Sequence, residues 1–352
     1  MFGMNIVLFG GSGRLGAAFL RQAHAHTLLC PRASEVDICD PIALHAYLDR
    51  AAPDLVVNAT GYNAVDRAES EEGKAAAYAM NTEAVESFAV WGALRDRPVI
   101  QFSTDYVFSG THTKTYTENS LPDPINAYGA SKAEGEKRAR ARYPSGAYII
   151  RTSRLFGPPT ESTSLKKSFL DLIHADAEKR PRFGVNREEY ASPTLVDDLA
   201  AWVVEHFFRH DRPPAGIYHA VGGGEPVTWF TWAQAYLEDA RLPVSIWPRD
   251  PNTMKRAAKR PAHLALASTK LPPLRNWREA QKAFLASRQP SFTPRWHEEL
   301  GLDAVRIEFQ KYIGTPAGGV MHLLPGGVEN PQGFGHSTRD IYAFNAQGRG
   351  QM

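Results

Sequence analysis

A glycine repeat directly after a short apolar segment constrains the fold of this chain more than any other feature. Residues 4–9 are Met-Asn-Ile-Val-Leu-Phe, and Gly10, Gly13 and Gly16 follow in a G-x-x-G-x-x-G spacing. The apolar run is typical of a strand buried on both faces of a parallel sheet, and residues 17–25 then favour a helix. Glycines at such a turn let a pyrophosphate approach the backbone and the helix N-terminus. The motif predicts a dinucleotide site, and a plain glycine-rich turn is the alternative.

Apolar segments that alternate with helical segments extend this pattern along the first half of the chain. Three further strands are expected at residues 27–30, 54–58 and 99–103. Strands alternating with helices predict an α/β fold with a doubly wound parallel sheet of the Rossmann type. After Pro158 the alternation loosens, and helices are expected at 165–177, 200–208 and, behind a Thr228 cap, 228–240. This second part predicts a smaller C-terminal substrate lobe, with a pocket in the cleft between the two.

Two arginines indicate which dinucleotide the site prefers. A carboxylate at the end of the second strand suits the free ribose hydroxyl of NAD, whereas an arginine suits the 2′-phosphate of NADP. Arg32 follows that strand and Arg14 lies in the glycine loop, so NADPH is predicted and NADH is the alternative. Both arginines would be ordinary surface residues if this interpretation were wrong.

The charge balance and the cysteine content exclude several classes of protein. The chain has 352 residues with 40 Lys and Arg against 38 Asp and Glu, a net charge of +2, which argues against a nucleic-acid binder held by bulk charge. Cys30 and Cys39 cannot form a disulfide framework and lack the spacing of a zinc site. No apolar run approaches the ~18 residues of a membrane span, and no basic segment precedes the first strand. We expect a cytoplasmic protein that binds no metal, nucleic acid or membrane.

A tyrosine and a lysine four residues apart predict acid–base chemistry. Tyr128 and Lys132 form a Y-x-x-x-K motif in a segment that favours a helix, and this spacing places both side chains on one helix face. An ammonium ~5 Å away is expected to lower the phenol pKa by roughly two units, toward neutral pH. Thr104, at the end of the fourth strand, would hydrogen-bond the same substrate carbonyl. A chance pair is the alternative, but the glycine motif upstream favours catalysis.

Several segments together resemble the extended short-chain dehydrogenase/reductases, and among them the dTDP-4-dehydrorhamnose reductase family. They are 10–16, 58–69, 103–110, 128–136 and 151–153, with further likeness at 191–194, 216–219, Trp229, 260–261 and 277–280. The resemblance covers roughly residues 4 to 287. It implies reduction by NADPH of the 4-keto group of a nucleotide-linked 4-keto-6-deoxy sugar, most simply dTDP-4-dehydro-L-rhamnose. Tyr128 would be the general acid, Lys132 its electrostatic partner and a ribose ligand, and Thr104 the residue that orients the carbonyl.

The motifs and the resemblance together imply two sets of binding residues. Cofactor contacts are expected from Gly10, Ser12, Gly13, Arg14, Leu15, Gly16, Arg32, Asp37, Ile38, Ala59, Thr60, Tyr62, Ser103, Tyr128 and Lys132. Substrate contacts are expected from Asn63, Val65, Ser103, Thr104, Asp105, Tyr106 and Arg154.

Three departures from the family pattern leave the identity of the keto-sugar open. Asn63 stands where the family usually has Thr, Arg154 stands where it usually has Trp, and residues 187–191 differ from its usual Asp-Asp-Gln-aromatic-Gly. Arg154 would either reach a phosphate or carboxylate of a ligand or pair with Glu188 or Glu189 in a structural role. The sequence does not decide between these alternatives.

We expect an NADP-binding domain over residues 1–157, to which about 185–221 return, a substrate lobe over 158–287, and a glycine-rich tail over 288–352. Nine glycines follow residue 313, so an independent core there is not expected, and an arm that crosses to a second copy in a homodimer is the preferred hypothesis. His322 and His336 lack a metal-ligand spacing. Four basic residues face either a diphosphate or solvent: Lys255, Arg256, Lys259 and Arg260. The aromatic cluster Trp229, Phe230, Trp232 and Tyr236 is expected to be core.

Two other functions stay open at this point. One is a related reductase or epimerase that acts on a different nucleotide sugar. The other is a non-catalytic protein that resembles the regulatory subunit of methionine adenosyltransferase and binds the cofactor. The presence of Thr104, Tyr128 and Lys132 favours catalysis.

Overall fold

The computed structural model describes residues 3–160, 167–250, 253, 255–288, 313–315 and 318–320. Its centre is a six-stranded sheet in the order β10-β5-β4-β3-β1-β2, in which every neighbouring pair is parallel. The strands are β1 (Asn5–Phe9), β2 (Thr27–Leu29), β3 (Leu55–Asn58), β4 (Val99–Thr104), β5 (Ala147–Thr152) and β10 (Gly216–His219). The predicted doubly wound parallel sheet is confirmed, and the four expected strands each lie within one residue of their predicted ends.

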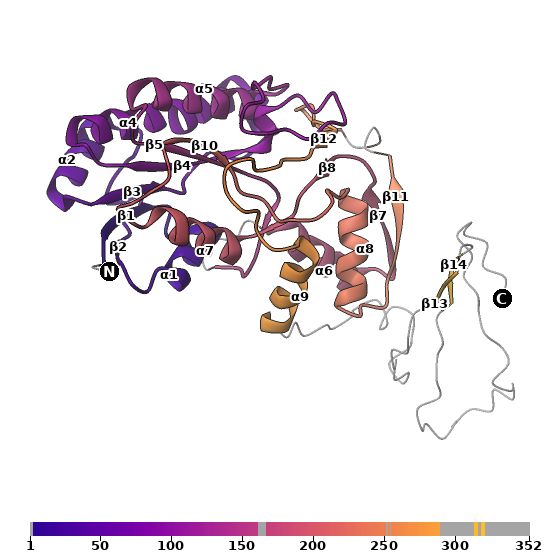
Figure 1. Ribbon diagram of the computed structural model, residues 1–352. Coiled ribbons are helices and arrows are strands. Elements are labelled where there is room, and N and C mark those ends of the chain that lie inside the picture. The colour runs from indigo at the N-terminus through magenta and orange to yellow at the C-terminus, as the bar shows by residue number, and fades with distance from the viewer. Residues whose placement is uncertain are drawn as a thin grey trace, which may run out of the picture.

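Both faces of the central strands are buried, which explains why β1 and β3 are almost entirely apolar. Ile6 and Leu8 pack with α1 (Arg14–Gln22) and α7 (Val196–Phe207), whereas Val7 and Phe9 pack with α2 (Pro41–Ala51) and α4 (Ala84–Arg95). Successive residues of a strand point to opposite faces, so one five-residue strand contributes to two cores. Figure 1 shows the resulting layers, with α4 and α5 over one face and α1 and α7 over the other.

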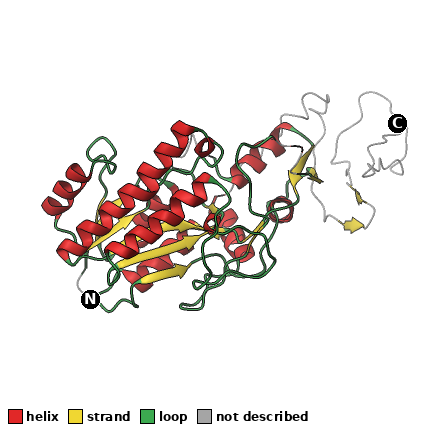
Figure 2. Ribbon diagram, turned by 90° about the horizontal axis from the view of Figure 1, so that it is seen from above, coloured by secondary structure: helices red, strands yellow, loops and turns green. Residues whose placement is uncertain are grey.

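Helix α5 (Ala127–Arg142) begins at a specific polar cap. The Asn126 side chain accepts a hydrogen bond from the backbone N–H of Gly129 at 2.8 Å, and such N-caps commonly stabilise a helix by about 1 kcal/mol. The cap fixes the first turn of α5 at the C-terminal ends of the strands and thereby positions Tyr128. In Figure 2 the helices run side by side over the strands of the sheet. The remaining helix on this side is α3 (Glu71–Tyr78), which continues through a π turn at Ala79–Glu83 into α4.

A second hydrophobic core is formed by residues between 156 and 285. It is formed by α6 (Phe169–Lys179), α8 (Trp229–Asp239) and α9 (Trp277–Arg288), and it buries Phe156, Trp232, Tyr236 and Phe284. Short parallel strand pairs lie beside it: β7 (Arg182–Asn186) with β11 (Ser245–Arg249), β6 (Leu155–Phe156) with β9 (Thr194–Leu195), and β8 (Tyr190–Ala191) with β12 (His263–Leu264). Trp232 and Tyr236 are therefore core residues, as expected.

The helices of this region differ from expectation at their starts. The Thr228 cap is confirmed, since its side chain accepts from the Thr231 N–H at 3.0 Å. Helix α6 begins four residues later than the predicted 165 because Ser168 and Asp171 form a capping box. Helix α7 begins at Val196, four residues earlier than predicted, because Leu195 ends its short strand immediately before it.

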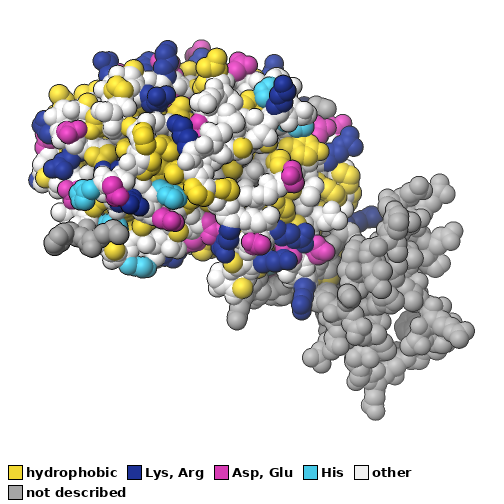
Figure 3. All heavy atoms as spheres, viewed as in Figure 1, with side chains coloured by type: hydrophobic (Ala, Val, Ile, Leu, Met, Phe, Trp, Pro, Cys, Tyr) yellow, Lys and Arg dark blue, Asp and Glu magenta, His cyan; other side chains and the backbone are white. Residues whose placement is uncertain are grey.

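Little of the glycine-rich tail belongs to the described residues. Within it, β13 (Ile313–Thr315) and β14 (Gly318–Val320) form an antiparallel pair, and the expected arm, His322 and His336 lie outside the described residues. Among the residues that are described, no helix has the length and apolar character needed to cross a membrane. Basic and acidic side chains are interspersed over the face drawn in Figure 3, in keeping with the near-neutral charge.

Candidate active site

The glycine loop packs against the end of the neighbouring strand β3. Gly10 adopts a φ of +85°, and a Cβ there would lie 2.9 Å from the Ala59 carbonyl group. A Cβ on Gly16 would lie 2.1 Å from the Gly10 carbonyl oxygen, and the Gly13 N–H donates to that same oxygen at 2.9 Å. Because the chain leaves β1 toward β2 on one side and returns to β3 on the other, this loop lies at the switch point where α/β sheets bind nucleotides.

Buried hydroxyls around this loop fit a polar ligand. Among the described residues, the side-chain oxygens of Tyr62, Ser103 and Thr152 are buried without a hydrogen-bond partner. Buried polar groups are nearly always paired in folded proteins, so such groups at the end of a parallel sheet suggest a ligand that supplies the partners. The close-packed glycine cradle, the N-terminus of α1 and these hydroxyls fit a dinucleotide.

The two arginines behind the NADPH prediction lie in different surroundings. Arg14 forms an ion pair with Asp171 at 3.1 Å and donates to the Gly157 carbonyl, so it links the glycine loop to helix α6 and to the segment after β6. Arg32 is exposed at the end of β2, and its backbone N–H donates to the Glu35 carboxylate at 2.7 Å. Of the two arginines, Arg32 is therefore the one that lies at the end of β2, where a guanidinium suits the 2′-phosphate of NADP.

Of four other expected cofactor residues, two are exposed and two are buried. Asp37 is exposed and accepts from the Cys39 N–H at 2.9 Å, whereas Ile38 and Leu15 pack in the cores beside the sheet. Ser12 is exposed, and its carbonyl accepts from the Thr160 hydroxyl at 2.9 Å.

The three candidate catalytic residues come together at the C-terminal edge of the sheet. Thr104 is the last residue of β4, and Tyr128 and Lys132 lie one turn apart on α5. The Tyr128 ring contacts the ring of Tyr106 at a centroid distance of 5.7 Å. The Lys132 ammonium is 3.4 Å from the carbonyl oxygen of Phe102. A Cβ on Gly61 would lie 2.7 Å from Lys132 Nζ, so the lysine also approaches the backbone after β3.

Burial, rather than the lysine, dominates the ionisation of Tyr128. Burial raises the pKa of Tyr128 to about 12, although hydrogen bonding to Thr104 acts in the opposite direction. Burial also lowers the pKa of Lys132 to about 8, against the effect of Glu136. Burial therefore shifts the phenol pKa in the direction opposite to the lowering toward neutral that the motif predicted. A phenol with this pKa stays protonated at neutral pH, which is the form that donates a proton.

A buried carboxylate adjoins Thr104, the candidate catalytic threonine. Asp105 is 4% exposed and accepts hydrogen bonds from Ser153 Oγ at 2.5 Å and Thr104 Oγ1 at 3.0 Å. Burial raises the pKa of Asp105 to about 6, and these hydrogen bonds and the charge of Arg154 act against that rise. Ionised Asp105 is thus held in the folded protein at a cost in free energy.

Replacing Asp105 by asparagine is expected to stabilise the protein at about pH 8 but not at about pH 4. The folded-state pKa of about 6 exceeds the ordinary aspartate value of 3.8, so stability decreases as the pH rises from about 4 to about 6. A shift of this size corresponds to about 3 kcal/mol above that window. Urea unfolding at both pH values measures the difference, with exposed Asp123→Asn as the control. Equal effects of Asp105→Asn at the two pH values would contradict the assignment.

Arg154 is held by main-chain carbonyl groups and an aromatic ring. Its guanidinium donates to the carbonyl of Val227 at 2.6 Å and to that of Glu189, and it lies 3.9 Å from the centre of the Trp229 ring. The Glu189 carboxylate instead accepts from Trp229 Nε1 and Asn186 Nδ2, each at 2.8 Å. Of the alternatives that the sequence left open, Arg154 does contact Glu189, but through the backbone rather than the carboxylate.

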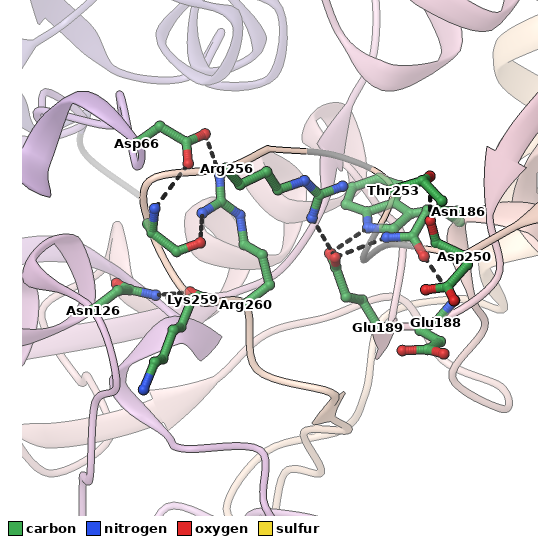
Figure 4. Close-up of polar contacts among 12 residues, drawn as sticks. Asp66, Asn126, Asn186, Glu188, Glu189, Asp250, Thr253, Arg256, Lys259 and Arg260 are labelled. Atoms are coloured by element: carbon green, nitrogen blue, oxygen red, sulfur yellow. Dashed lines mark hydrogen bonds and ion pairs between the residues drawn. The ribbon is translucent and has the colours of Figure 1, made fainter.

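The basic segment 255–260 contacts both the residue before β8 and the loop after β3. Arg256 forms an ion pair with Glu189 at 2.5 Å, and Arg260 forms one with Asp66 at 2.6 Å. Asn126 Nδ2 donates to the Lys259 carbonyl oxygen at 3.0 Å, as Figure 4 shows. The arginines therefore anchor the segment, while the side chains of Lys255 and Lys259 are exposed. Asp66 closes the loop that carries Asn63 and Val65, so this anchor also fixes two expected substrate contacts.

Sequence reasoning missed Asn81, which holds the loop after β3. Asn81 is 1% exposed in the π turn, and its amide accepts from the Tyr62 N–H at 3.0 Å and donates to the Tyr62 carbonyl at 2.9 Å. It also donates to Ser131 Oγ at 3.0 Å. Irregular turns of this kind are frequent at functional sites, but no sequence signal marks this one. The role of Glu136 was missed for the same reason, since it depends on a contact with Arg151 in another element.

No group of three or more potential metal-ligating side chains occurs within the described part of the chain. The two cysteines, Cys30 and Cys39, are free.

Comparisons with known proteins agree with this site. A family model described as the RmlD substrate binding domain matches residues 4–289. The chain is 31% identical over 282 residues to a dTDP-4-dehydrorhamnose reductase of Aggregatibacter actinomycetemcomitans, covering 76% of this chain and 91% of that protein. It is 32% identical over 306 residues to a probable dTDP-4,6-dihydroxy-2-methyloxan-3-one 4-ketoreductase of Streptomyces antibioticus, covering 82% and 98%.

A solved structure shares the fold over the same region. The dTDP-4-dehydrorhamnose reductase of Bacillus anthracis in complex with NADP aligns with a TM-score of 0.74 at 24% identity, covering 81% of this chain and 99% of that one. The family match extends from the first strand to the end of α9, and it includes the glycine loop, Thr104, Tyr128 and Lys132. The chain belongs to the dTDP-4-dehydrorhamnose reductase family of the extended short-chain dehydrogenase/reductases.

Proposed function

We propose that the protein reduces, with NADPH, the 4-keto group of a nucleotide-linked 4-keto-6-deoxy sugar. The substrate is dTDP-4-dehydro-L-rhamnose, giving dTDP-L-rhamnose, or a close analogue of it. The observation that carries the proposal is the half-buried phenol of Tyr128, whose pKa of about 12 keeps it protonated beside Thr104 at the C-terminal edge of the sheet.

The chain's own groups suit the proton-transfer half of such a reduction. Bound NADPH would supply the hydride that adds to C4 of the sugar. Tyr128 gives its phenolic proton to the carbonyl oxygen, so that C=O becomes CH–OH and the phenol becomes phenolate. Thr104 would orient that oxygen when its hydroxyl turns to it from Asp105, to which it donates at 3.0 Å in this structure. Lys132, whose pKa is lowered to about 8 by burial, is mainly cationic at neutral pH and stabilises the phenolate until a proton returns.

The placement of Arg32 supports NADPH as the reductant. It is an exposed arginine directly after β2, where a guanidinium suits a 2′-phosphate. The relative from Bacillus anthracis was solved with NADP. Steady-state KM values for NADPH and NADH measure the preference, and a clear preference for NADH would contradict this part of the proposal.

The decisive experiment is turnover by the purified chain. NADPH oxidation with dTDP-4-dehydro-L-rhamnose is followed by the nicotinamide absorbance, and the product is identified as the reduced nucleotide sugar. Turnover of another dTDP-4-keto-6-deoxy sugar instead would assign a related ketoreductase, a class that includes the relative from Streptomyces antibioticus. Tight NADPH binding without turnover of any keto-sugar would overturn the catalytic proposal in favour of a cofactor-binding protein.

Gly16→Ala is expected to weaken NADPH binding strongly. A Cβ at this position would lie 2.1 Å from the Gly10 carbonyl oxygen, so the loop has to move away from α1. Because the loop backbone receives the pyrophosphate, we expect KM for NADPH to rise by at least about tenfold, roughly 1.4 kcal/mol of binding free energy.

The matched control for this variant is Ala17→Gly on the next residue of α1. It weakens the helix by about 1 kcal/mol without placing an atom against the loop, so its KM for NADPH should stay near the wild-type value. Equal KM values for Gly16→Ala and the wild type would remove the glycine loop from the cofactor site.

We further propose a cytoplasmic location and a homodimer. The free cysteines support a reducing compartment. The glycine-rich tail is the segment that we expect to cross between copies. Measuring the solution mass gives the number of subunits for the full chain and for a chain that ends at residue 287. The same number of subunits in both would show that the tail is not needed for the interface.

A further inference from the structure

The side-chain amide of Asn126 contacts two different parts of the protein. Its Oδ1 accepts from the backbone N–H of Gly129 at 2.8 Å and thereby caps α5, whereas its Nδ2 donates to the carbonyl oxygen of Lys259 at 3.0 Å. Asn126 is 6% exposed, so water competes little for either contact. The two partners also fix the orientation of the amide, because an N–H group needs an acceptor and a carbonyl oxygen needs a donor.

The cap by itself does not require asparagine. Serine and aspartate cap helices about as well as asparagine does, and both would supply an acceptor for the Gly129 N–H group. Of the three side chains, asparagine is the one that places a separate N–H donor beside that acceptor. The bond to the Lys259 carbonyl is therefore what this side chain adds to a plain helix cap.

Segment 258–260 is held in turn by Asp66. The two carboxylate oxygens of Asp66 accept from the backbone N–H of Ala258 at 3.1 Å and from the Arg260 guanidinium at 2.6 Å. These two residues lie on either side of Lys259, so its carbonyl oxygen is fixed between them (Figure 4). The Arg260 guanidinium also donates to the Ala258 carbonyl at 2.9 Å, which stiffens the segment further.

The first turn of α5 also contacts the segments that follow β3 and β4. The Ala127 N–H donates at 2.9 Å to the carboxylate of Glu69, which lies in the 3₁₀ turn after β3. A Cβ on Gly129 would lie 2.1 Å from the Tyr106 carbonyl oxygen, so this turn packs directly on the backbone after β4. Three elements therefore locate the start of α5, and Tyr128 lies within that turn.

Tyr128 thus shares a common support with the loop after β3, which carries two expected substrate contacts. Asn63 and Val65 come shortly before Asp66 in that loop, and Asp66 and Asn126 hold the same three-residue segment. A proton donor has to lie within about 2.6–3.2 Å of the oxygen that it protonates, and a misplacement of about 1 Å can cost about 100-fold in rate. Contacts that hold both sides on one segment keep the phenol within this range.

We propose that Asn126 is a positioning residue for the proton donor, and that its bond to the Lys259 carbonyl keeps Tyr128 in register with the loop after β3. Asn126 acts through the backbone of the first turn of α5. The inference rests on the proposed function and adds to it the contact that holds the proton donor in place.

Asn126→Asp tests the bond to Lys259 while the cap is kept. Ionised aspartate has nearly the shape of asparagine and an acceptor for the Gly129 N–H group, but it offers no proton to the Lys259 carbonyl. With the keto-sugar that the wild type reduces, we expect kcat to fall by about 10- to 100-fold. KM for NADPH should stay near the wild-type value, because the glycine loop is untouched.

Asp40→Ala is the matched control for an altered helix start. Asp40 caps α2 by accepting from the backbone N–H groups of Ile42 at 2.9 Å and Ala43 at 3.2 Å. Its loss should lower the urea midpoint of unfolding, as loss of a cap does, yet leave kcat within about twofold of the wild-type value.

A double-mutant cycle separates positioning from a general loss of stability. Arg260→Met releases the same segment from Asp66 and should also lower kcat, whereas Arg260→Lys keeps a cation for Asp66 and should lower kcat less. Residues that act through one set of contacts have non-additive effects. The kcat of the Asn126→Asp, Arg260→Met double variant should therefore be close to that of the more impaired single variant.

Two results would overturn the inference while the proposed function stands. One is an Asn126→Asp variant whose kcat equals that of the wild type. The other is a double variant whose loss of kcat is the product of the two single losses, since independent structural damage gives that result. If the wild type reduces no keto-sugar, the proposed function fails and this inference fails with it.

Discussion

Replacing Tyr128 by phenylalanine is expected to lower kcat for keto-sugar reduction by about 10²- to 10⁴-fold, the usual contribution of a positioned proton donor. The substitution removes one hydroxyl and keeps the ring that packs against Tyr106 at a centroid distance of 5.7 Å. Because the pKa of Tyr128 is raised to about 12, nearly every molecule carries the catalytic proton at neutral pH. Loss of the proton, rather than loss of binding, should therefore dominate, with KM changed much less than kcat.

Tyr143→Phe provides the matched control at the opposite end of α5. Tyr143 caps the C-terminus of α5 and donates to Asp96 at 3.1 Å, far along the helix from Tyr128. Its variant should keep kcat within about twofold. A Tyr128→Phe enzyme whose kcat stays within about threefold of the wild type would exclude Tyr128 as the proton donor.

Replacing Glu136 by alanine is expected to lower the free energy of unfolding by about 3–5 kcal/mol. Glu136 is 4% exposed and accepts hydrogen bonds from the fully buried Arg151 at 2.6, 3.0 and 3.1 Å. The Arg151 guanidinium also lies 5.0 Å from the centre of the Phe108 ring. Without the carboxylate, a charged guanidinium stays in an apolar core, where solvation cannot compensate it.

Urea unfolding measures this loss, and Glu134→Ala is its control. Glu134 lies on the same helix and pairs with Arg138 at 2.9 Å, but its side chain is 31% exposed. Exposed or partly exposed pairs typically contribute about 1 kcal/mol or less. If both variants lose a similar free energy of unfolding, burial does not make the Glu136–Arg151 pair more important for stability than the partly exposed Glu134–Arg138 pair.

The sheet and the glycine loop were predictable because their signals are local. Strands β1 and β3 are marked by runs of apolar residues, and Gly10, Gly13 and Gly16 follow β1 at fixed three-residue intervals. The pairing of Tyr128 with Lys132 on one helix face follows from the helical repeat alone. These features need no knowledge of distant residues.

The ionisation of the site and the surroundings of Arg154 were not predictable, because both depend on contacts across the chain. Arg154 is fixed by Glu189, Val227 and Trp229, which lie 35 to 75 residues later in the sequence. The pKa of Tyr128 depends on how deeply the folded protein buries it, and no spacing rule contains that information. Arg14 was assigned to the cofactor from its place in the loop, yet its ion pair is with Asp171 in α6.

The packing of α1 against α7 has a consequence for how the protein is made. Leu15, Ala18 and Phe19 of α1 are covered by Leu199, Val203 and Phe207 of α7. A ribosome adding about 5–20 residues each second needs roughly 10–40 s to travel from the first helix to the second. During that time the apolar face of α1, formed by Leu15, Ala18 and Phe19, has no α7 to cover it. Chaperone binding to nascent chains should therefore end only once α7 has emerged.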